Sequence, residues 1–458
     1  MEREFKNIKM IKWSKWTILL LAVIAVWYGK NLDTWGRNRI IQNDVISYYA
    51  YLPATFIFHD LSFSFAYNLP EDFEGTIWLQ TAPNGKPYLK MTMGLAILWI
   101  PFFLLAHLYA GVSGIEALGY SWPYSLSIFI ATIFYFIVGL HFLRKLLLRY
   151  FSEAVSAVTL LIIVMATNML YYVISEPGMS HIYNFTLITT FLYYTIKWTE
   201  NPKNNYIIIL AVLAGIIVLI RPVNVFILIF PAFIGVSSLK EFLNRLSSNR
   251  KSILFAGVVA LLIVIPQLIY WKIQTGHWIF NSYGEEGFFF SNPQIINGLF
   301  SYRKGWFVYT PVMFIAFLGV PLLYKKVPGT IFPIILFISL NIYVVFSWWC
   351  WWYGGSFGAR PMIDMYGVMA LPLAALINAI RQNKFVMMFS ILLLIGFIWL
   401  NQFQMSQYRT SLLHWDSMTK EAYFGIFGKK QRPEGYNQMI QAPDYEKALK
   451  GENEYSKK

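Results

Sequence analysis

Apolar runs long enough to cross a lipid bilayer alternate with short polar stretches along almost the whole chain. A helix needs about 20 predominantly apolar residues to span the hydrocarbon core, and twelve runs approach that length. They are centred in 16–29, 94–112, 121–142, 152–174, 180–198, 204–220, 223–238, 252–272, 305–324, 328–349, 361–380 and 384–402. This pattern predicts an all-α membrane protein that crosses the bilayer many times.

The composition agrees with this class and narrows the choice of partners. Of 458 residues, 57% are hydrophobic and 13% are charged, well below the roughly 25% charged residues of soluble domains. The net charge of +14 comes mostly from short basic clusters between apolar runs, where such clusters anchor cytoplasmic loops. We therefore predict that the protein contacts membrane lipids and does not bind nucleic acid. A single cysteine, Cys350, excludes an intramolecular disulfide.

The basic clusters also indicate whether 94–112 spans the membrane. Cytoplasmic loops are enriched in Lys and Arg. If 94–112 spans, four basic clusters fall outside: 144–149, 240–251, 325–326 and 381–384. If it is interfacial or re-entrant, these clusters become cytoplasmic, and past residue 112 only five basic residues of the membrane domain stay outside. The charge pattern favours the second arrangement.

The predicted architecture is a polytopic all-α protein with about eleven transmembrane helices and a cytoplasmic N-terminus. A transmembrane domain covers residues 1–402 and includes a large first external loop, 30–120, that carries interfacial helices. Residues 403–458 form an external C-terminal tail. With this topology, most of the unusual polar residues gather at the external face.

Asp44 stands near the start of the first external loop, in the stretch QNDVISYYAYLPATFIF. At helical spacing Asp44, Tyr48 and Tyr51 share one stripe, while apolar residues face another way, which predicts an amphipathic helix lying on the membrane. Asp44 is either the N-cap of that helix or a general base that takes the proton from an attacking hydroxyl. Other acids of the same loop are weaker candidates for the base: Asp33, Asp60 and Asp72.

Three external turns place a charged residue directly before a proline that opens a helix: Glu176, Arg221 and Arg360. Proline suits the first helical position, and the free N–H groups of a helix N-terminus attract phosphate. A guanidinium also grips phosphate bidentately. We predict Arg221 and Arg360, with Arg303 and Lys304 of SYRKGWF, as phosphate ligands. Glu176 is a second candidate catalytic group that orients a hydroxyl. Arginines that snorkel to the interface are the alternative.

The aromatic residues of WWCWWYGGSFGARP have two interpretations. They form an interfacial belt, or Trp352 and Tyr353, with Tyr48, contact a sugar ring or a lipid chain. Glu285 and Glu286 are interpreted as solvated loop charge, with substrate orientation as the alternative. No histidine pair shows the spacing of metal ligands. The sequence predicts no cofactor and no metal site, and a requirement for a divalent metal is left open.

In this order along the chain, these segments resemble the GT-C superfamily of integral-membrane glycosyltransferases, which includes the protein O-mannosyltransferases and the lipid A aminoarabinose transferase. Asp44 in QNDVISYY matches the acid at the start of their large external loop. PYLKMTMGLAILWIPFF, with Lys90, is similar to their Lys-Pro-Pro-type interfacial helix but lacks the two prolines. HFLRKLLLRYF resembles their basic cytoplasmic loop, and SYRKGWFVYTP and WWYGGSFGARPMID resemble segments of bacterial members.

The resemblance implies an inverting glycosyltransferase of the bacterial inner membrane, with its C-terminal tail in the periplasm. Such an enzyme moves a sugar from a polyprenyl-phosphate donor to a lipid, glycan or protein acceptor at the external face. Asp44 would deprotonate the acceptor, and four cations would compete for the donor phosphate: Lys90, Arg221, Arg303 and Arg360. A transporter or lipid flippase is the alternative, but its ionisable residues should line a path near the middle of the bilayer. A non-catalytic scaffold whose tail binds partners is a second alternative.

Overall fold

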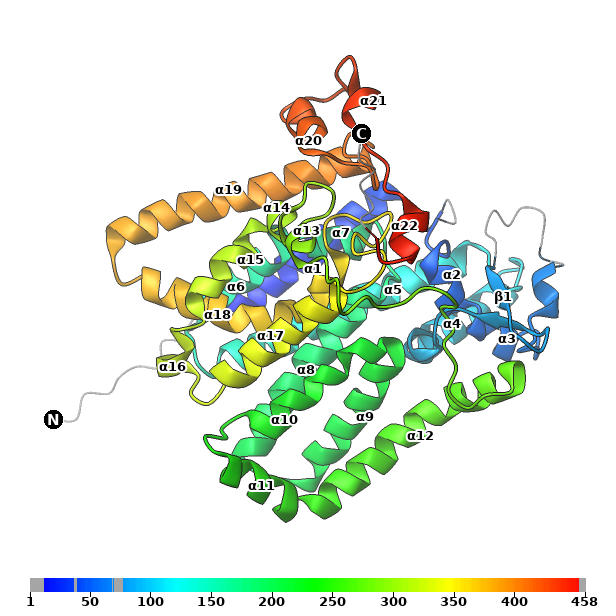
Figure 1. Cartoon of the computed structure of the whole chain (residues 1–458), viewed down its shortest axis with the longest axis horizontal. Coiled ribbons are helices and arrows are strands. Elements are labelled where there is room, and N and C mark those ends of the chain that lie inside the picture. Colours follow the sequence, from blue (N-terminus) through cyan, green and yellow to red (C-terminus); the bar gives the residue numbers. More distant parts are fainter. Residues whose placement is uncertain (1–11, 37–38, 68, 70–76, 453–458) are drawn as a thin grey trace.

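The computed structural model describes residues 12–36, 39–67, 69 and 77–452. Asp72 and the basic residues before Lys12 lie outside the described residues. Long helices lie side by side, and the first external loop gathers at one end of this bundle, as Figure 1 shows in blue. The helical bundle comprises α1 (Trp13–Leu32), α5 (Trp122–Leu147), α6 (Glu153–Met165), α7 (Met169–Ile174), α8 (Ser180–Glu200), α9 (Asn204–Ile220), η2 (Pro222–Leu228), α10 (Ile229–Phe233), α11 (Leu239–Ser248), α12 (Arg250–Thr275), α15 (Pro311–Ala316), η3 (Phe317–Gly319), α16 (Leu323–Lys326), α17 (Ile331–Val345), η4 (Arg360–Met365), α18 (Tyr366–Ile380) and α19 (Lys384–Arg409).

Shorter elements, together with helix α4, form the loops and the tail. The first loop contains α2 (Asp44–Tyr49), α3 (Tyr51–Phe56), η1 (Ser64–Tyr67), the antiparallel strands β1 (Leu79–Thr81) and β2 (Pro87–Leu89), and α4 (Gly94–Val112). Later loops and the tail contain α13 (Ile295–Phe300), α14 (Trp306–Tyr309), α20 (Lys420–Ile426), α21 (Tyr436–Met439) and α22 (Tyr445–Leu449).

The twelve apolar runs are all largely helical, as predicted. Among the described residues, five helical segments are long and apolar enough to cross a membrane by themselves: α4, α5, α12, η4 with α18, and α19. Several other runs are divided into shorter helices, such as η2 with α10. The structure supports a mostly helical protein with several candidate spans, and the count of eleven spans stays a prediction.

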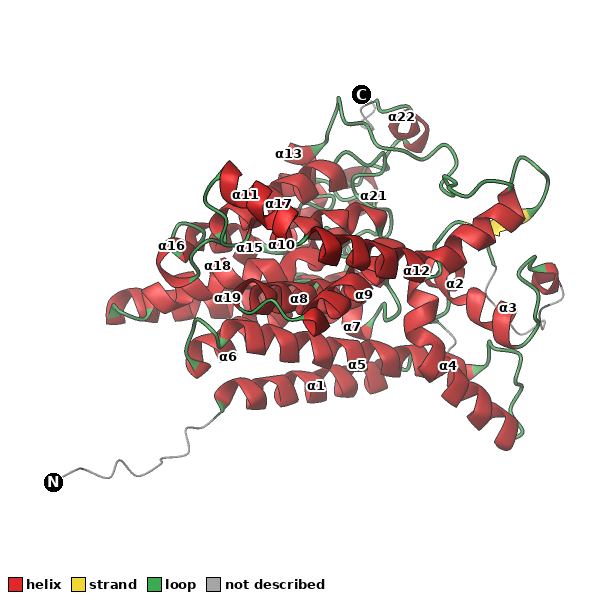
Figure 2. Cartoon of the chain, turned by 90° about the horizontal axis from the view of Figure 1, so that it is seen from below, coloured by secondary structure: helices red, strands yellow, loops and turns green. Residues whose placement is uncertain are grey.

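Helix α4 covers the run that we predict not to span. It packs against the first half of α5, with ring centroids 5.7 Å apart for Phe102 and Phe134 and 5.9 Å apart for Tyr109 and Trp122. Figure 2 shows α4 diverging from the direction shared by α1 and α5. Pro101 lies inside α4 and is accommodated without ending the helix. That α4 is interfacial or re-entrant, and does not span the bilayer, stays a prediction.

The predicted amphipathic surface helix around Asp44 is wrong. The chain forms two short helices, α2 and α3, that meet at Ala50, and every residue of 45–54 is buried. The Tyr49 hydroxyl donates to the Gly119 carbonyl at 2.5 Å, and the Tyr51 hydroxyl donates to the Met91 carbonyl at 2.8 Å. Since the later parts of the same loop supply these partners, the segment is embedded in protein on both faces.

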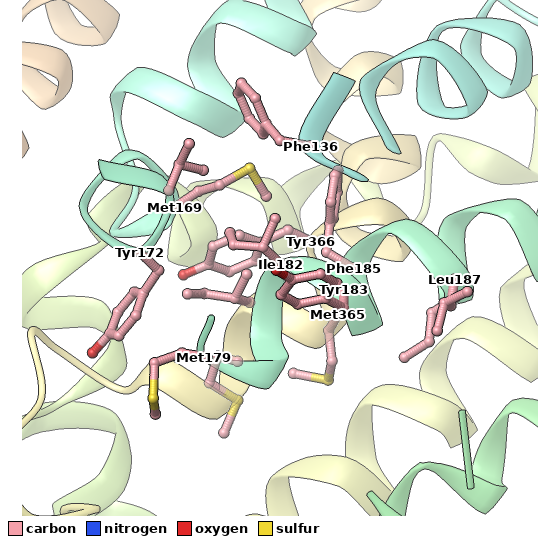
Figure 3. Close-up of a cluster of buried hydrophobic side chains, with 14 of the residues drawn as sticks. Phe136, Met169, Tyr172, Met179, Ile182, Tyr183, Phe185, Leu187, Met365 and Tyr366 are labelled. Atoms are coloured by element: carbon pink, nitrogen blue, oxygen red, sulfur yellow. The ribbon is translucent and has the colours of Figure 1, made fainter. Parts of the chain in front are cut away.

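Helix α8 lies at the centre of the bundle, and its first turn lies at the end of the bundle that meets Asp44 and Tyr48. Figure 3 shows Ile182, Tyr183 and Phe185 of α8 gathered with side chains from α5, α7 and α18. Gly367 of α18 allows a close approach to α8, because a Cβ there would lie 1.9 Å from the Thr189 hydroxyl oxygen. Small residues at helix contacts have this role in membrane proteins. The packing fixes the position of the first residues of α8.

The C-terminal tail folds back onto the loops that carry Arg303 and Trp352. Helix α19 continues to Arg409, beyond the predicted boundary at 402, because polar side chains of its last turns are covered by the tail. Gln404 Nε2 donates to the Tyr423 hydroxyl at 2.7 Å, and Gln407 Nε2 donates to the Ile426 carbonyl at 2.7 Å. Figure 1 shows α20 and α21 in orange and red above the end of α19, and α22 in red lower and to the right.

Candidate functional site

A cavity of about 600 Å³ lies where the first external loop meets the ends of α8, α9 and η4. Its wall contains three cations, Lys90, Arg221 and Arg360, and two acids, Asp44 and Glu286. The other lining residues are Tyr48, Met91, Met179, Ser180, His181, Ile220, Pro222, Val223, Asn281, Tyr283, Gly287, Phe288, Val345, Trp348, Trp349, Cys350, Tyr353, Gly354 and Tyr445. A concave apolar wall with a few charged groups is typical of a ligand site.

All ten predicted site residues lie among the described residues, and six of them line this cavity. These six are Asp44, Tyr48, Lys90, Arg221, Tyr353 and Arg360. Four others lie outside the lining: Glu176, Arg303, Lys304 and Trp352.

Asp44 and Arg360 meet on the cavity wall, although 316 residues separate them along the chain. Arg360 NH2 donates to Asp44 Oδ2 at 2.9 Å. Asn43, with a φ of 51°, is the N-cap of α2, so the interpretation of Asp44 as the N-cap is wrong. Gly358, in the left-handed region at φ 64°, passes close to Tyr309 and directs the chain into η4. This turn places Arg360 at the start of η4, opposite the start of α2.

Arg221 is held by a buried acid that sequence reasoning missed, Asp364 of η4. Asp364 is 3% exposed and accepts hydrogen bonds from Asn224 Nδ2 at 2.8 Å and Asn184 Nδ2 at 3.2 Å. His181 Nδ1 lies 3.0 Å from Asp364 Oδ1, and Arg221 NH1 lies 3.4 Å from Asp364 Oδ2. An acid inside the apolar run PMIDMYGVMALPLAAL was the available signal. Asp364 therefore orients two side chains that line the cavity.

Lys90 forms an ion pair with Glu286, and both residues line the cavity. The second oxygen of Glu286, Oε2, accepts from Trp349 Nε1 at 3.0 Å. The Lys90 ammonium also lies 5.1 Å from the centre of the Tyr283 ring. The interpretation of Glu286 as solvated loop charge is therefore wrong, because a lysine from the first loop and a tryptophan from a later loop hold it at the cavity.

Tyr48 and Glu176 differ in their access to the cavity. Tyr48 lines it, and burial, with the nearby charge of Asp44, raises the pKa of its hydroxyl to about 12. Glu176 lies behind the wall in the turn between α7 and α8, where it accepts from the Tyr171 hydroxyl at 2.9 Å. Burial raises the pKa of Glu176, and the charge of Arg360 opposes that rise. Tyr48 stays a neutral donor on the cavity wall, whereas Glu176 lies outside the cavity lining.

Arg303, Lys304 and Trp352 are buried under the C-terminal tail. Arg303 donates to the Asp416 carbonyl of the tail, and its guanidinium lies 5.7 Å from the centre of the Trp352 ring. Lys304 donates to the Ser356 carbonyl, and burial lowers the pKa of its ammonium to about 7. Sequence reasoning placed the two cations at the external face but could not show that the tail covers them.

In the part of the chain that the structure describes, no three His, Cys, Asp or Glu side chains come together as metal ligands do. The charged groups on the cavity wall are instead arranged as acid–cation pairs: Asp44 with Arg360, and Glu286 with Lys90.

No protein-family model and no curated protein sequence matches the chain. Its fold is similar to that of archaeal oligosaccharyltransferase AglB from Archaeoglobus fulgidus in complex with an inhibitory peptide and a dolichol-phosphate, with a TM-score of 0.51 and 13% identity over 97% of this chain and 61% of that one. The apo form of the Archaeoglobus fulgidus oligosaccharyltransferase gives a TM-score of 0.50 and 13% identity, over 100% and 62% of the two chains.

These matches concern the fold, and this chain spans about three fifths of the oligosaccharyltransferase chain. The fold is therefore similar to that of the archaeal oligosaccharyltransferase, and membership of the GT-C superfamily stays a prediction. A closer relation to the protein O-mannosyltransferases or the aminoarabinose transferase stays a prediction. The chain thus shares its overall fold with the matched part of an archaeal oligosaccharyltransferase.

Proposed function

We propose that this protein is a glycosyltransferase that moves a sugar from a polyprenyl-phosphate donor to a lipid, glycan or protein acceptor. The observation that carries the proposal is the meeting of one carboxylate, Asp44, with Arg360 and Arg221 on the wall of one cavity, in a fold similar to that of an archaeal oligosaccharyltransferase. AglB, which shares this fold, binds a dolichol-phosphate and an inhibitory peptide. A donor of the same lipid-phosphate class suits two arginines at the ends of helices.

In the proposed reaction, Asp44 accepts the proton of the acceptor hydroxyl. The acceptor oxygen then forms a bond to the anomeric carbon of the sugar, while the bond from that carbon to the phosphate oxygen breaks. The electron pair of the broken bond leaves with the polyprenyl phosphate. Attack from the face opposite the phosphate inverts the anomeric configuration. Arg360 and Arg221 stabilise the charge that develops on the leaving phosphate.

Arg360 has enough donors to serve both acid and phosphate. A guanidinium carries five N–H groups, and one nitrogen of Arg360 contacts Asp44. The remaining donors suit the phosphate, so the arginine sets the position of the base relative to the leaving group. Arg221, oriented by Asp364, adds a second cation to the same wall.

We place the cavity at the periplasmic face of the bacterial inner membrane, with the N-terminus in the cytoplasm and the tail outside. The distribution of basic residues supports this orientation. Arg144, near the end of α5, pairs with Glu153 at the start of α6. Arg381, after the end of α18, donates to Ser152. These residues mark the end of the bundle opposite the cavity, which the rule for basic loops assigns to the cytoplasm.

The proposal is tested with purified protein in lipid nanodiscs and a polyprenyl-phosphate pool extracted from the source strain. Mass spectrometry should show a lipid-linked sugar that is consumed while bare polyprenyl phosphate appears, and this conversion should require Asp44. A strain without the gene should accumulate the same lipid-linked sugar and lose one surface glycan. Binding of neither polyprenyl phosphate nor any sugar-linked form would contradict the proposal.

A further inference from the structure

Two external loops pair across one side of the cavity. The Trp349 amide donates to the Gly287 carbonyl at 3.0 Å, and the Phe289 amide donates to the Ser347 carbonyl at 2.7 Å. These bonds make a short antiparallel bridge between the GEEGFFF and SWWCWW segments. The bridge places the Glu286 side chain next to the indole of Trp349, on the cavity wall.

Glu286 and Lys90 are bound to each other and still have hydrogen-bonding capacity. A carboxylate has about four lone-pair sites and an ammonium has three donors. Each carboxylate oxygen of Glu286 accepts one hydrogen bond: Oε1 from Lys90 and Oε2 from Trp349. The two side chains are 23% and 25% exposed, and both line the cavity. Additional acceptors of Glu286 and donors of Lys90 are therefore within reach of a ligand.

This pair suits an uncharged polyol better than it suits a phosphate. Lys90 and Glu286 are bound directly to each other, whereas Arg360 and Arg221, which contact Asp44 and Asp364, each keep further guanidinium N–H groups in the fork geometry that suits a phosphodiester. A sugar hydroxyl both donates and accepts, so one hydroxyl can donate to Glu286 while it or its neighbour accepts from Lys90. The aromatic rings of Tyr283 and Trp348, with centroids 5.4 Å apart and nearly perpendicular, supply apolar surface for the face of the sugar ring.

We propose that Lys90, Glu286 and Trp349 form the subsite that recognises the hydroxyl groups of the transferred sugar, while Arg221 and Arg360 hold the donor phosphate. This inference rests on the proposed function. It reassigns Lys90 from the phosphate to the sugar and makes Glu286 a specificity-determining residue. A site that hydrogen-bonds the hydroxyl groups of its substrate discriminates between sugars, because a ligand that lacks the matching hydroxyl leaves protein groups unpaired when it covers them.

The test compares two probes: a short-chain polyprenyl phosphate without sugar, and the same lipid carrying one hexose or N-acetylhexosamine from a panel. The natural protein should bind at least one sugar-linked lipid more tightly than the bare lipid. The charge-neutral double variant Lys90→Gln/Glu286→Gln should bind the bare lipid as before and the preferred sugar-linked lipid about tenfold or more weakly, since hydrogen bonds to charged groups are lost. Trp349→Phe keeps an aromatic ring but removes the indole N–H. It should weaken binding of the sugar-linked lipid and leave binding of the bare lipid unchanged.

Glu285→Gln is the matched control, because Glu285 is the exposed neighbour outside the cavity lining and undergoes the same chemical change. It should leave both affinities unchanged. If the double variant binds both lipids more weakly by the same factor, Lys90 is a phosphate ligand and the inference fails. If neither affinity changes, or if the natural protein prefers no sugar-linked lipid to the bare lipid, the subsite does not exist. Failure of the natural protein to bind either lipid would instead reject the proposed function itself.

Discussion

Replacing Asp44 with asparagine separates catalysis from folding at the candidate site. Asparagine has the same shape and keeps an oxygen that can accept from Arg360, whose NH2 lies 2.9 Å from Asp44 Oδ2. The amide cannot take a proton from the acceptor hydroxyl. Because Asn43 is the N-cap of α2, the change removes no capping interaction. The substitution therefore removes the base and one negative charge, and leaves the helix intact.

The two consequences differ greatly in size. General-base catalysis contributes about 100- to 10,000-fold in rate, which corresponds to about 3 to 5 kcal/mol in the activation barrier. The Asp44 side chain is 29% exposed, and ion pairs that solvent reaches contribute about 1 kcal/mol or less to stability. We expect Asp44→Asn to abolish most transfer while the protein folds and binds its donor nearly as before.

The assay measures single-turnover transfer at saturating donor, together with donor affinity and thermal unfolding of the same preparation. Asp33→Asn is the matched control. Asp33 belongs to the same loop and ends α1 with φ 47° and ψ 41°, a left-handed conformation that asparagine also adopts, and it lies outside the cavity lining. If Asp44→Asn transfers within about tenfold of the natural protein, below the range expected for a general base, Asp44 is not the base.

Three further outcomes follow from the same structure. Arg360→Ala should weaken donor binding strongly and Arg360→Lys should restore part of it, because an ammonium lacks the planar fork; unchanged affinity in a folded Arg360→Ala protein would make the arginine structural. Burial lowers the pKa of Lys304 from 10.5 to about 7 in the folded protein. Between pH 7 and 10.5, the Lys304 side chain is therefore protonated in the unfolded chain and mostly neutral in the folded protein. The free energy of unfolding should therefore rise with pH across that window, by roughly 5 kcal/mol in total. Denaturant unfolding of Lys304→Met should lack this rise, and identical pH profiles of the two proteins would contradict a lowered pKa of Lys304. Reporter fusions after residues 118, 178 and 410 should read external and fusions near 147 and 246 cytoplasmic, whereas a cytoplasmic tail would overturn the topology.

The location of polar chemistry at one end of the bundle could be predicted because it follows from local sequence. An acid at the start of the external loop and arginines before helix-opening prolines are visible in QNDVISYY, RPVN and GARP. The charge rule then puts these segments on one side of the membrane. Six of the predicted residues do line one cavity. Pairing Asp44 with Arg360 was beyond this reasoning, since it depends on how η4 packs beside α2.

The features that the sequence could not show all depend on long-range packing. The surface helix predicted around Asp44 is buried because Gly119 and Met91, far along the same loop, accept its tyrosine hydroxyls. Glu286 is indistinguishable from Glu285 by composition, and only the bridge to Trp349 brings it to the cavity. Periodicity and charge counts describe single elements, so they carry no information about which loop covers which.

The acids around the cavity differ in burial, and this difference assigns their roles. Asp364 is 3% exposed, so it can orient Arg221 but does not meet a substrate. Asp44 and Glu286 are 29% and 23% exposed and line the cavity, so both can touch the reacting molecules. Of these two, Asp44 shares its partner with the proposed phosphate site, whereas Glu286 is paired with a lysine and an indole. A base must lie beside the bond that breaks, and Asp44 is the acid that meets this condition.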